Sequence, residues 1–147
     1  MASLAIYENY SLLFCHFTCF PIWAKQASPY IGLGIVARKL REYAESRQNH
    51  QKALAIYIKF DDRYSQAIAH FQLGRVAEEL GEMEEAKANY LLDLQINSEF
   101  KEEKSLGISL SNLGQFYKVT QDESLLGEIS QILRITVEEV QKKLEST

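Results

Sequence analysis

The chain has 147 residues, of which 46% are hydrophobic and only two are proline, so it can bury a core and form long uninterrupted helices. The formal net charge of −4 argues against a nucleic-acid-binding protein, because such proteins need a basic excess to neutralise phosphates. Val and Thr are sparse and no Asn-Gly or Asp-Gly hairpin turn occurs, which excludes a strand-rich fold and favours an all-helical one.

Residues 1–26 differ from the rest of the chain in composition. Leu4-Ala5-Ile6-Tyr7 repeats Leu54-Ala55-Ile56-Tyr57, so this segment has the sequence of the end of a helix from a preceding unit. Tyr10 precedes Leu33 by 23 positions, whereas its counterpart Phe60 precedes Leu73 by 13. We therefore expect a half-repeat remnant followed by an aromatic insertion of about ten residues.

Three interpretations of the insertion stay open. It covers the open face of the first unit, it pairs two chains through an exposed apolar patch, or it contacts a membrane surface or a metal. The candidate residues for pairing two chains are Leu13, Phe14, Phe17, Phe20 and Trp23.

The insertion carries weak signals for a metal, a membrane or secretion. Cys15, His16 and Cys19 supply at most three zinc ligands where a structural site needs four. His16 and Pro21 interrupt a stretch that is too short to span a bilayer. Two cysteines do not make a disulfide framework, and no positive charge precedes the apolar stretch as in a signal peptide. We expect no metal, no membrane insertion and a cytoplasmic location.

A period of 40 residues runs through the remainder of the chain. The positions that align without a gap include Leu33-Gly34, Leu73-Gly74 and Leu113-Gly114, and Val36, Val76 and Phe116. A competing spacing of 33 pairs Ala53 with Ala86 and Tyr57 with Tyr90 but leaves the third unit unexplained. The helix pairs are expected at residues 27–66, 67–106 and 107–135.

The second unit shows the physical logic of the repeat. Its first helix has apolar residues at spacings of mostly three and four, which predicts one buried face: Ala67, Ile68, Phe71, Leu73, Val76, Ala77 and Leu80. Gly74 is expected where two helices approach closely, and Gly81 is expected to end the first helix in a left-handed conformation. A second helix is expected over residues 84–96, where the small Ala86 again permits close packing.

These positions resemble a known family. The pattern Leu73-Gly74-x-x-Ala77, Gly81, Ala86 and Tyr90 is similar to the tetratricopeptide repeat, in the 40-residue form common in bacterial arrays. The third unit has Leu126 and Ser130 in place of its small and aromatic residues, and the first unit has Ser46 and His50. Asp93 replaces a further small residue in the second unit. The resemblance spans residues 27 to about 133 and implies an all-α, right-handed superhelical solenoid of antiparallel helix pairs.

The end of the chain has the pattern of a capping helix. Thr136-x-x-Glu139 predicts a capping box at the start of a helix. Its apolar face is expected to hold Val137, Val140 and Leu144. A repeat array needs a terminal element with a polar outer face, so we expect residues 136–147 to close the array.

The resemblance implies a concave groove, lined by the first helices, that takes an extended or helical segment of a partner protein. The phase of the repeat places these residues in it: Ile31, Ile35, Arg38 and Lys39 in the first unit; Ile68, Phe71, Arg75, Glu78 and Glu79 in the second; Ile108, Ser111, Gln115 and Lys118 in the third. This mixture of aliphatic and charged side chains favours an amphipathic partner segment.

Members of this family that grip the carboxylate tail of heat-shock chaperones use a set of Lys, Asn and Arg side chains. The phase of the repeat places Ile31, Ile35, Gln72, Ile108 and Asn112 at those positions. The cations of the set are absent, so we expect no chaperone-tail binding.

Charge is unevenly distributed along the array. Residues 38–64 carry seven basic and four acidic side chains, and residues 78–104 carry three basic and nine acidic ones. Two explanations fit this pattern: solvated helix faces, or charge-complementary stacking with another copy or a polar partner.

No motif for catalysis is present. The chain has no phosphate-binding loop, no Gly-x-Ser-x-Gly and no His-Glu-x-x-His, and His16, His50 and His70 are scattered over the chain. We expect a protein without enzymatic activity or cofactor that binds another protein. The alternative is a self-associating repeat fragment that forms a homodimer through the aromatic N-terminal segment.

Overall fold

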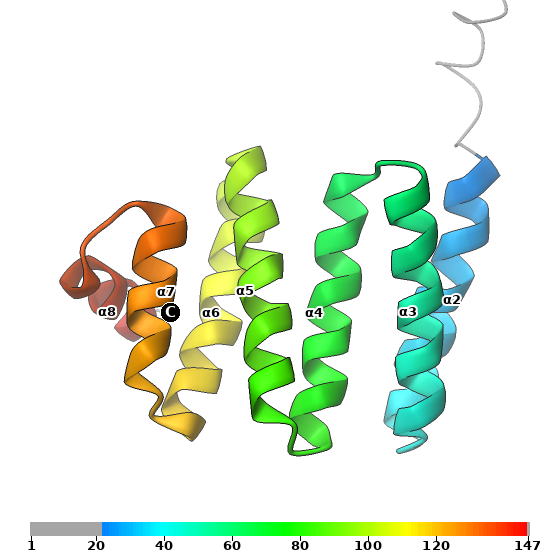
Figure 1. Cartoon of the computed structure of the whole chain (residues 1–147), viewed down its shortest axis with the longest axis horizontal. Helices are drawn as coiled ribbons and strands as arrows, with labels where there is room; N and C mark the ends of the chain where they lie inside the picture. The colour runs from blue at the N-terminus through cyan, green and yellow to red at the C-terminus, as the bar shows by residue number, and fades with distance from the viewer. Residues whose placement is uncertain (1–21, 147) are drawn as a thin grey trace, which may run out of the picture.

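The computed structural model describes residues 22–146, and every regular element in this range is a helix (Figure 1). The helices are α2 (Ile22–Lys39), α3 (Tyr43–Lys59), α4 (Arg63–Glu79), α5 (Met83–Phe100), α6 (Glu103–Thr120), α7 (Glu123–Leu133) and α8 (Val137–Glu145). From α2 to α6 each helix packs closely against the next one in the sequence. The fold is therefore the all-helical repeat array that the sequence predicts.

Short turns with one left-handed residue join the helices. The left-handed residues from α2 to α7 are Arg41, Asp61, Gly81, Lys101 and Gln121, all with positive φ. They lie twenty residues apart, so one helix with its turn takes twenty residues and one pair takes forty. Gly81 has φ +77°, which glycine adopts without a steric penalty, and it follows the end of α4 as expected.

A glycine-to-ring contact holds the two helices of a pair together. Gly74 of α4 faces the ring of Tyr90 on α5, and a Cβ atom at Gly74 would lie 2.7 Å from Cε1 of that ring. Gly34 of α2 faces the ring of His50 on α3 in the same way. The Ser46 hydroxyl donates to the carbonyl of Gly34 at 2.7 Å. The first unit therefore keeps the close approach with a different ring and an added hydrogen bond.

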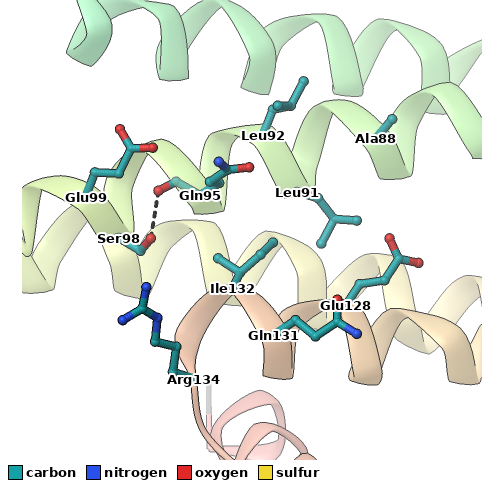
Figure 2. Close-up of a pocket in the computed structure, with 10 residues that line it drawn as sticks. All are labelled: Ala88, Leu91, Leu92, Gln95, Ser98, Glu99, Glu128, Gln131, Ile132 and Arg134. Atoms are coloured by element: carbon teal, nitrogen blue, oxygen red, sulfur yellow. Dashed lines mark hydrogen bonds between the residues drawn. The ribbon is translucent and has the colours of Figure 1, made fainter.

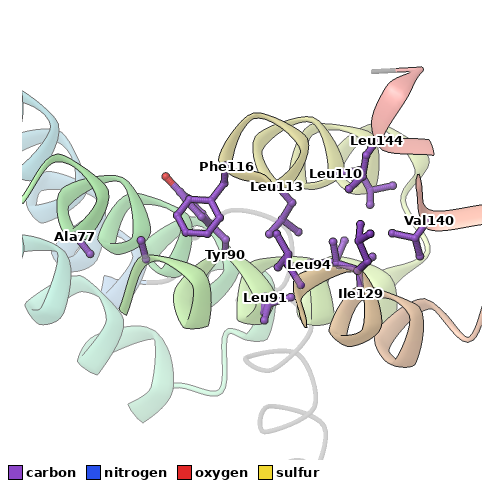
Figure 3. Packing of buried hydrophobic residues seen from close by; sticks show 13 residues of the cluster. Ala77, Tyr90, Leu91, Leu94, Leu110, Leu113, Phe116, Ile129, Val140 and Leu144 are labelled. Atoms are coloured by element: carbon purple, nitrogen blue, oxygen red, sulfur yellow. The ribbon is translucent and has the colours of Figure 1, made fainter. Parts of the chain in front are cut away.

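The third unit is built differently from the first two. Gly114 of α6 faces Leu144 of α8, and α8 packs closely against both α6 and α7, whereas α6 and α7 do not approach each other as closely. Val140 and Leu144 are buried with Leu113 of α6 and Ile129 of α7 (Figure 3). Helix α7 was expected to be the partner of α6, but α8 occupies the position that faces the glycine.

The termini of two helices follow local sequence rules. Oγ1 of Thr136 accepts a hydrogen bond from the backbone N–H of Glu139 at 3.2 Å, and the Glu139 carboxylate accepts one from the N–H of Thr136 at 2.9 Å. This is the predicted capping box, and it is confirmed. The Asp62 side chain caps α4 by accepting from the N–H of Ser65 at 3.1 Å.

Two expected boundaries differ from the structure. Residues 22–26 were assigned to the aromatic insertion, but they form the start of α2, and Pro29 lies on an exposed position inside that helix. The helix pairs are separated at residues 60–62 and 101–102 rather than at 66 and 106. The candidate pairing residues Leu13, Phe14, Phe17 and Phe20 lie outside the described residues, as does the side chain of Trp23.

Ion pairs within the chain use part of the uneven charge. Arg38 of α2 pairs with Glu79 of α4 at 2.5 Å, and Arg47 of α3 pairs with Glu82 before α5. Lys87 of α5 pairs with Asp122 before α7 at 2.9 Å. Basic side chains of one unit thus meet acidic side chains of the next, which neither expected explanation included.

Candidate partner-binding groove

Helices α4 and α6 present equivalent positions of the repeat to the same side of the array. Ile68 and Ile108 are forty residues apart and both are exposed. Arg75 and Gln115 are also forty residues apart, and of these Arg75 is half-buried and Gln115 is exposed. Spacings of three and four along a helix keep these side chains on one face. Two cavities lie between α4 and α6, with α5 as their floor, and we call them together the α4–α6 groove.

The first cavity is polar and has a volume of about 390 Å³. It is lined by Phe71, Arg75, Glu78, Glu79, Tyr90, Asn112 and Gln115. The Tyr90 hydroxyl donates to the Glu78 carboxylate at 2.6 Å, and burial, aided by this hydrogen bond, raises the pKa of Tyr90. The Arg75 guanidinium lies 5.7 Å from the centre of the Phe71 ring, a distance at which the ring attracts a cation. This polar cavity presents charges of both signs.

The second cavity is mainly apolar at its rim and has a volume of about 210 Å³. It is lined by Tyr64, Ala67, Ile68, Phe71, Asp93, Asn97, Ser105, Ile108 and Ser109. Phe71 also lines the polar cavity, so the two cavities are neighbours along the groove. The groove therefore offers an apolar half and a charged half side by side.

A buried polar triad forms part of the floor of the apolar cavity. The Ser109 hydroxyl donates to the Asp93 carboxylate at 2.7 Å, and the Asn97 amide donates to the same carboxylate at 2.9 Å. Burial raises the pKa of Asp93 to about 6 against these two hydrogen bonds, which lower it. Forty residues earlier the same positions hold Ala53, Tyr57 and Ala69, which are buried together as an apolar cluster. The second unit thus has a smaller, polar group where the first has a tyrosine ring.

A family comparison connects this geometry to known proteins. Residues 25–92 match the family model of the tetratricopeptide repeat. Residues 25–92 are tetratricopeptide repeats. The match covers a little under half of the chain, from α2 into α5. Neither the curated proteins nor the solved structures give a match to the chain. Tetratricopeptide repeats generally form a non-catalytic fold that binds other proteins.

Seven of the residues predicted for the groove line the two cavities. They are Ile68, Phe71, Arg75, Glu78 and Glu79 of α4 and Ile108 and Gln115 of α6. The remaining six, Ile31, Ile35, Arg38, Lys39, Ser111 and Lys118, line neither cavity. Ile31 packs against the apolar cluster of the first unit, and the Arg38 side chain is held by Glu79. The groove of this helical array is therefore centred on its second and third units.

Several residues of the groove were not predicted as site residues. Tyr90 was recognised only as the aromatic residue of the repeat pattern, and Asp93 only as a departure from the small residue of the repeat. The change from an apolar to a polar side chain at a buried repeat position was the signal for Asp93. Asn97 and Ser109 carried the same signal, because they stand at the positions of Tyr57 and Ala69.

The largest of the cavities described is formed by the second helices of the units, α5 and α7. It has a volume of about 630 Å³ and lies between α5 and α7, with Leu91 and Ile132 on its walls (Figure 2). Its further lining residues are Ala88, Leu92, Gln95, Ser98, Glu99, Glu128, Gln131 and Arg134. None of the predicted groove residues lines it, and it shares no residue with the α4–α6 groove.

Between residues 22 and 146, no helix is long and apolar enough to cross a membrane. Within the same described range, no three His, Cys, Asp or Glu side chains are grouped so that they could hold a metal ion.

Two buried groups are expected to act on stability in opposite directions between pH 4 and pH 6. Burial, with Arg38 nearby, lowers the pKa of His50 to about 4. As the pH falls, His50 is therefore protonated in the unfolded chain before it is protonated in the folded chain, and the folded chain loses stability. The raised pKa of Asp93 means that the folded chain keeps its proton longer, so Asp93 reduces stability as the pH rises. Each group changes the free energy of unfolding by about 3 kcal/mol over the full pH range between its unfolded and folded pKa values.

Asp93→Asn should therefore change the pH dependence of the free energy of unfolding. Asparagine does not titrate, so the variant no longer loses stability at this position as the pH rises. Its free energy of unfolding should therefore rise more steeply from pH 4 to pH 6 than that of the wild type, by up to about 3 kcal/mol. Urea unfolding at several pH values measures both curves. Parallel curves would show that Asp93 has an ordinary pKa in the folded chain.

Proposed function

We propose that this array binds a segment of a partner protein in the α4–α6 groove and has no catalytic role. The observation that carries the proposal is the adjacency of the two cavities across Phe71. A segment lying along the groove meets Ile68 and Ile108 in one half and Arg75 with Glu78 in the other. The groove suits an amphipathic segment, helical or extended, with apolar side chains followed by polar ones.

The charges of the polar cavity favour a partner with an acidic group at one position. Arg75 has no ion pair within 4 Å among the residues that the structure describes, and its guanidinium lies over Phe71. Arginine can hold a carboxylate through two parallel hydrogen bonds. Glu78 accepts from Tyr90 and Glu79 from Arg38, so both acids already have donors within the chain.

We further propose that the groove does not hold the carboxylate tail of a chaperone. The cationic clamp of that interaction needs paired Lys and Arg side chains, and the corresponding positions here include Ile31, Ile35 and Ile108. An acidic tail peptide with micromolar affinity for the wild type would contradict this.

The test compares isoleucines inside and outside the groove. A peptide selected from a displayed library on the full chain is titrated by calorimetry against Ile68→Ser, Ile108→Ser and Ile58→Ser. All three isoleucines are exposed, but only the first two line the apolar cavity. Ile68→Ser and Ile108→Ser should each remove an apolar contact that contributes about 1–2 kcal/mol to the binding free energy. Each substitution should therefore weaken binding by about 5- to 30-fold. Ile58→Ser should bind like the wild type.

The outcomes separate the groove from the remaining surface. Equal affinities of all three variants and the wild type would show that the peptide binds elsewhere. Circular dichroism of each variant checks that the helices are retained, so that a lost affinity is not a lost fold.

A further inference from the structure

One face of α2 is apolar and has nothing packed on it within the described residues. Leu33, Val36 and Leu40 are all exposed, and Val36 shows 54% of its surface. Their spacings of three and four place them on one side of the helix. An exposed apolar stripe of this kind is typical of a surface that another element covers.

The repeat positions of Leu33 and Val36 are buried in the next two units, whereas Leu80, at the position of Leu40, stays exposed. Val76 of α4 is 0% exposed and Phe116 of α6 is 2% exposed. Leu73 and Leu113, which correspond to Leu33, are buried as well. The difference between α2 and the other two first helices therefore lies in what covers this face, since the side chains are of the same kind.

The element that covers the face in the later units is the second helix of the unit before. Helix α3 packs against α4, and α5 packs against α6. The Phe116 ring meets the Tyr90 ring of α5 at a centroid distance of 5.6 Å and an interplanar angle of 71°. Figure 3 shows this contact beside Leu113. The face of α2 thus has the shape and chemistry to receive a helix.

The segment before α2 has the length of such an element. Helix α3 and its connection to α4 occupy residues 43–62, and the forty-residue register moves them to residues 3–22. Helix α2 begins at Ile22, so this register needs no insertion. It replaces the alignment of Leu4–Tyr7 with Leu54–Tyr57, which required ten extra residues.

The uninterrupted register also places suitable side chains. Tyr10 stands at the position of His50 and Tyr90, and Phe17 stands at the position of the buried Tyr57. Tyr90 is the residue that meets Phe116. The equivalent pair of positions, eighty residues earlier, is Tyr10 and Val36.

We propose that residues 3–19 of the chain dock on the face formed by Leu33 and Val36, in the position that α3 holds on α4. These residues lie outside the described part of the structure. The proposal concerns the end of the array and is independent of the α4–α6 groove. A second copy of the chain or a different protein on this face is a competing outcome of the test.

The test is a double-mutant cycle in the full chain. Val36→Ser should lower the Tm by about 5 °C, because a covered valine is replaced by a polar side chain. Val119→Ser is the matched control, since Val119 is 69% exposed on α6, and it should shift the Tm by about 1 °C or less. Tyr10→Ser should lower the Tm in the wild type and have less effect in the Val36→Ser background, whereas its effect should add to that of Val119→Ser.

Three results would overturn the proposal. The first is a Val36→Ser variant as stable as Val119→Ser, and the second is a cycle that is strictly additive. The third is a Tm that rises with protein concentration together with a dimer in sedimentation, because a second copy would then cover the face.

Cross-linking keeps the proposal testable if a serine variant fails to fold. The native cysteines are Cys15 and Cys19, so Val36→Cys adds one thiol on the exposed face and Val119→Cys adds one elsewhere. A short bis-maleimide should join position 36 to Cys15 or Cys19 within one chain, as identified by mass spectrometry of the monomer band. Links only between chains, or an equal yield from Val119→Cys, would contradict docking within the chain.

Discussion

Replacing Gly34 with alanine is expected to lower the free energy of unfolding by about 2 kcal/mol, whereas replacing Gly32 with alanine should raise it by about 1 kcal/mol. Both glycines lie in α2. A Cβ atom at Gly34 would lie 2.6 Å from Nε2 of His50, but among the described residues a Cβ atom at Gly32 would meet nothing within 4 Å. Alanine improves helix propensity at both positions, and only at Gly34 does the new methyl group collide with a neighbour.

The His50 ring has little freedom to avoid that methyl group. It is fully buried, and neither ring nitrogen has a hydrogen-bond partner within residues 22–146. Urea unfolding of the two variants and the wild type gives the two free-energy differences. Similar stabilities for Gly34→Ala and Gly32→Ala would show that α2 and α3 do not approach each other at this glycine.

Leu144→Ala is expected to destabilise the chain by about 3 kcal/mol. Leu144 is buried between α8 and α6, where it lies against Gly114. Truncation leaves a cavity at the position that α5 fills in the preceding unit. Val137→Ala in the same helix is the control, because Val137 is exposed and its truncation should change the stability by about 0.5 kcal/mol or less.

Thermal and urea unfolding of these variants decides the role of α8. A strong effect of Leu144→Ala and a weak one of Val137→Ala would show that α8 is part of the third unit. If Leu144→Ala were as mild as Val137→Ala, α8 would be a surface helix that only covers the end of the array.

The features predicted correctly from the sequence depend on neighbouring residues. Gly81 ends α4 because a left-handed residue is needed there, and Thr136 with Glu139 forms a capping box within one turn. Gly74 was predicted at a close helix approach because a glycine inside a helix disfavours the helix unless packing requires it. These rules involve few residues and are visible in the printed sequence.

The features that were missed depend on packing between distant segments. Nothing local to residues 137–145 indicates that Leu144 faces Gly114, because α7 comes first in the sequence and was the natural partner for α6. The start of α2 was placed too late because residues 22–26 were assigned to the aromatic insertion. Pro29 lies inside α2 on an exposed position of that helix.

The groove was predicted in part for a similar reason. Repeat phase correctly brought Ile68, Phe71 and Ile108 to one cavity, because helix periodicity and the forty-residue spacing fix which side they occupy. It could not show that the Arg38 side chain is held by Glu79 or that the cavities centre on the second and third units. Those facts depend on which side chains fill the space between helices.

The most direct test of the groove is methyl NMR of the isoleucine side chains during titration with the selected peptide. The α4–α6 groove predicts that the Ile68 and Ile108 methyl signals shift together and saturate at one equivalent of peptide, while the Ile58 signal stays in place. Shifts centred on Ile132, on the wall of the cavity between α5 and α7, with Ile68 and Ile108 unchanged, would contradict partner binding in the groove.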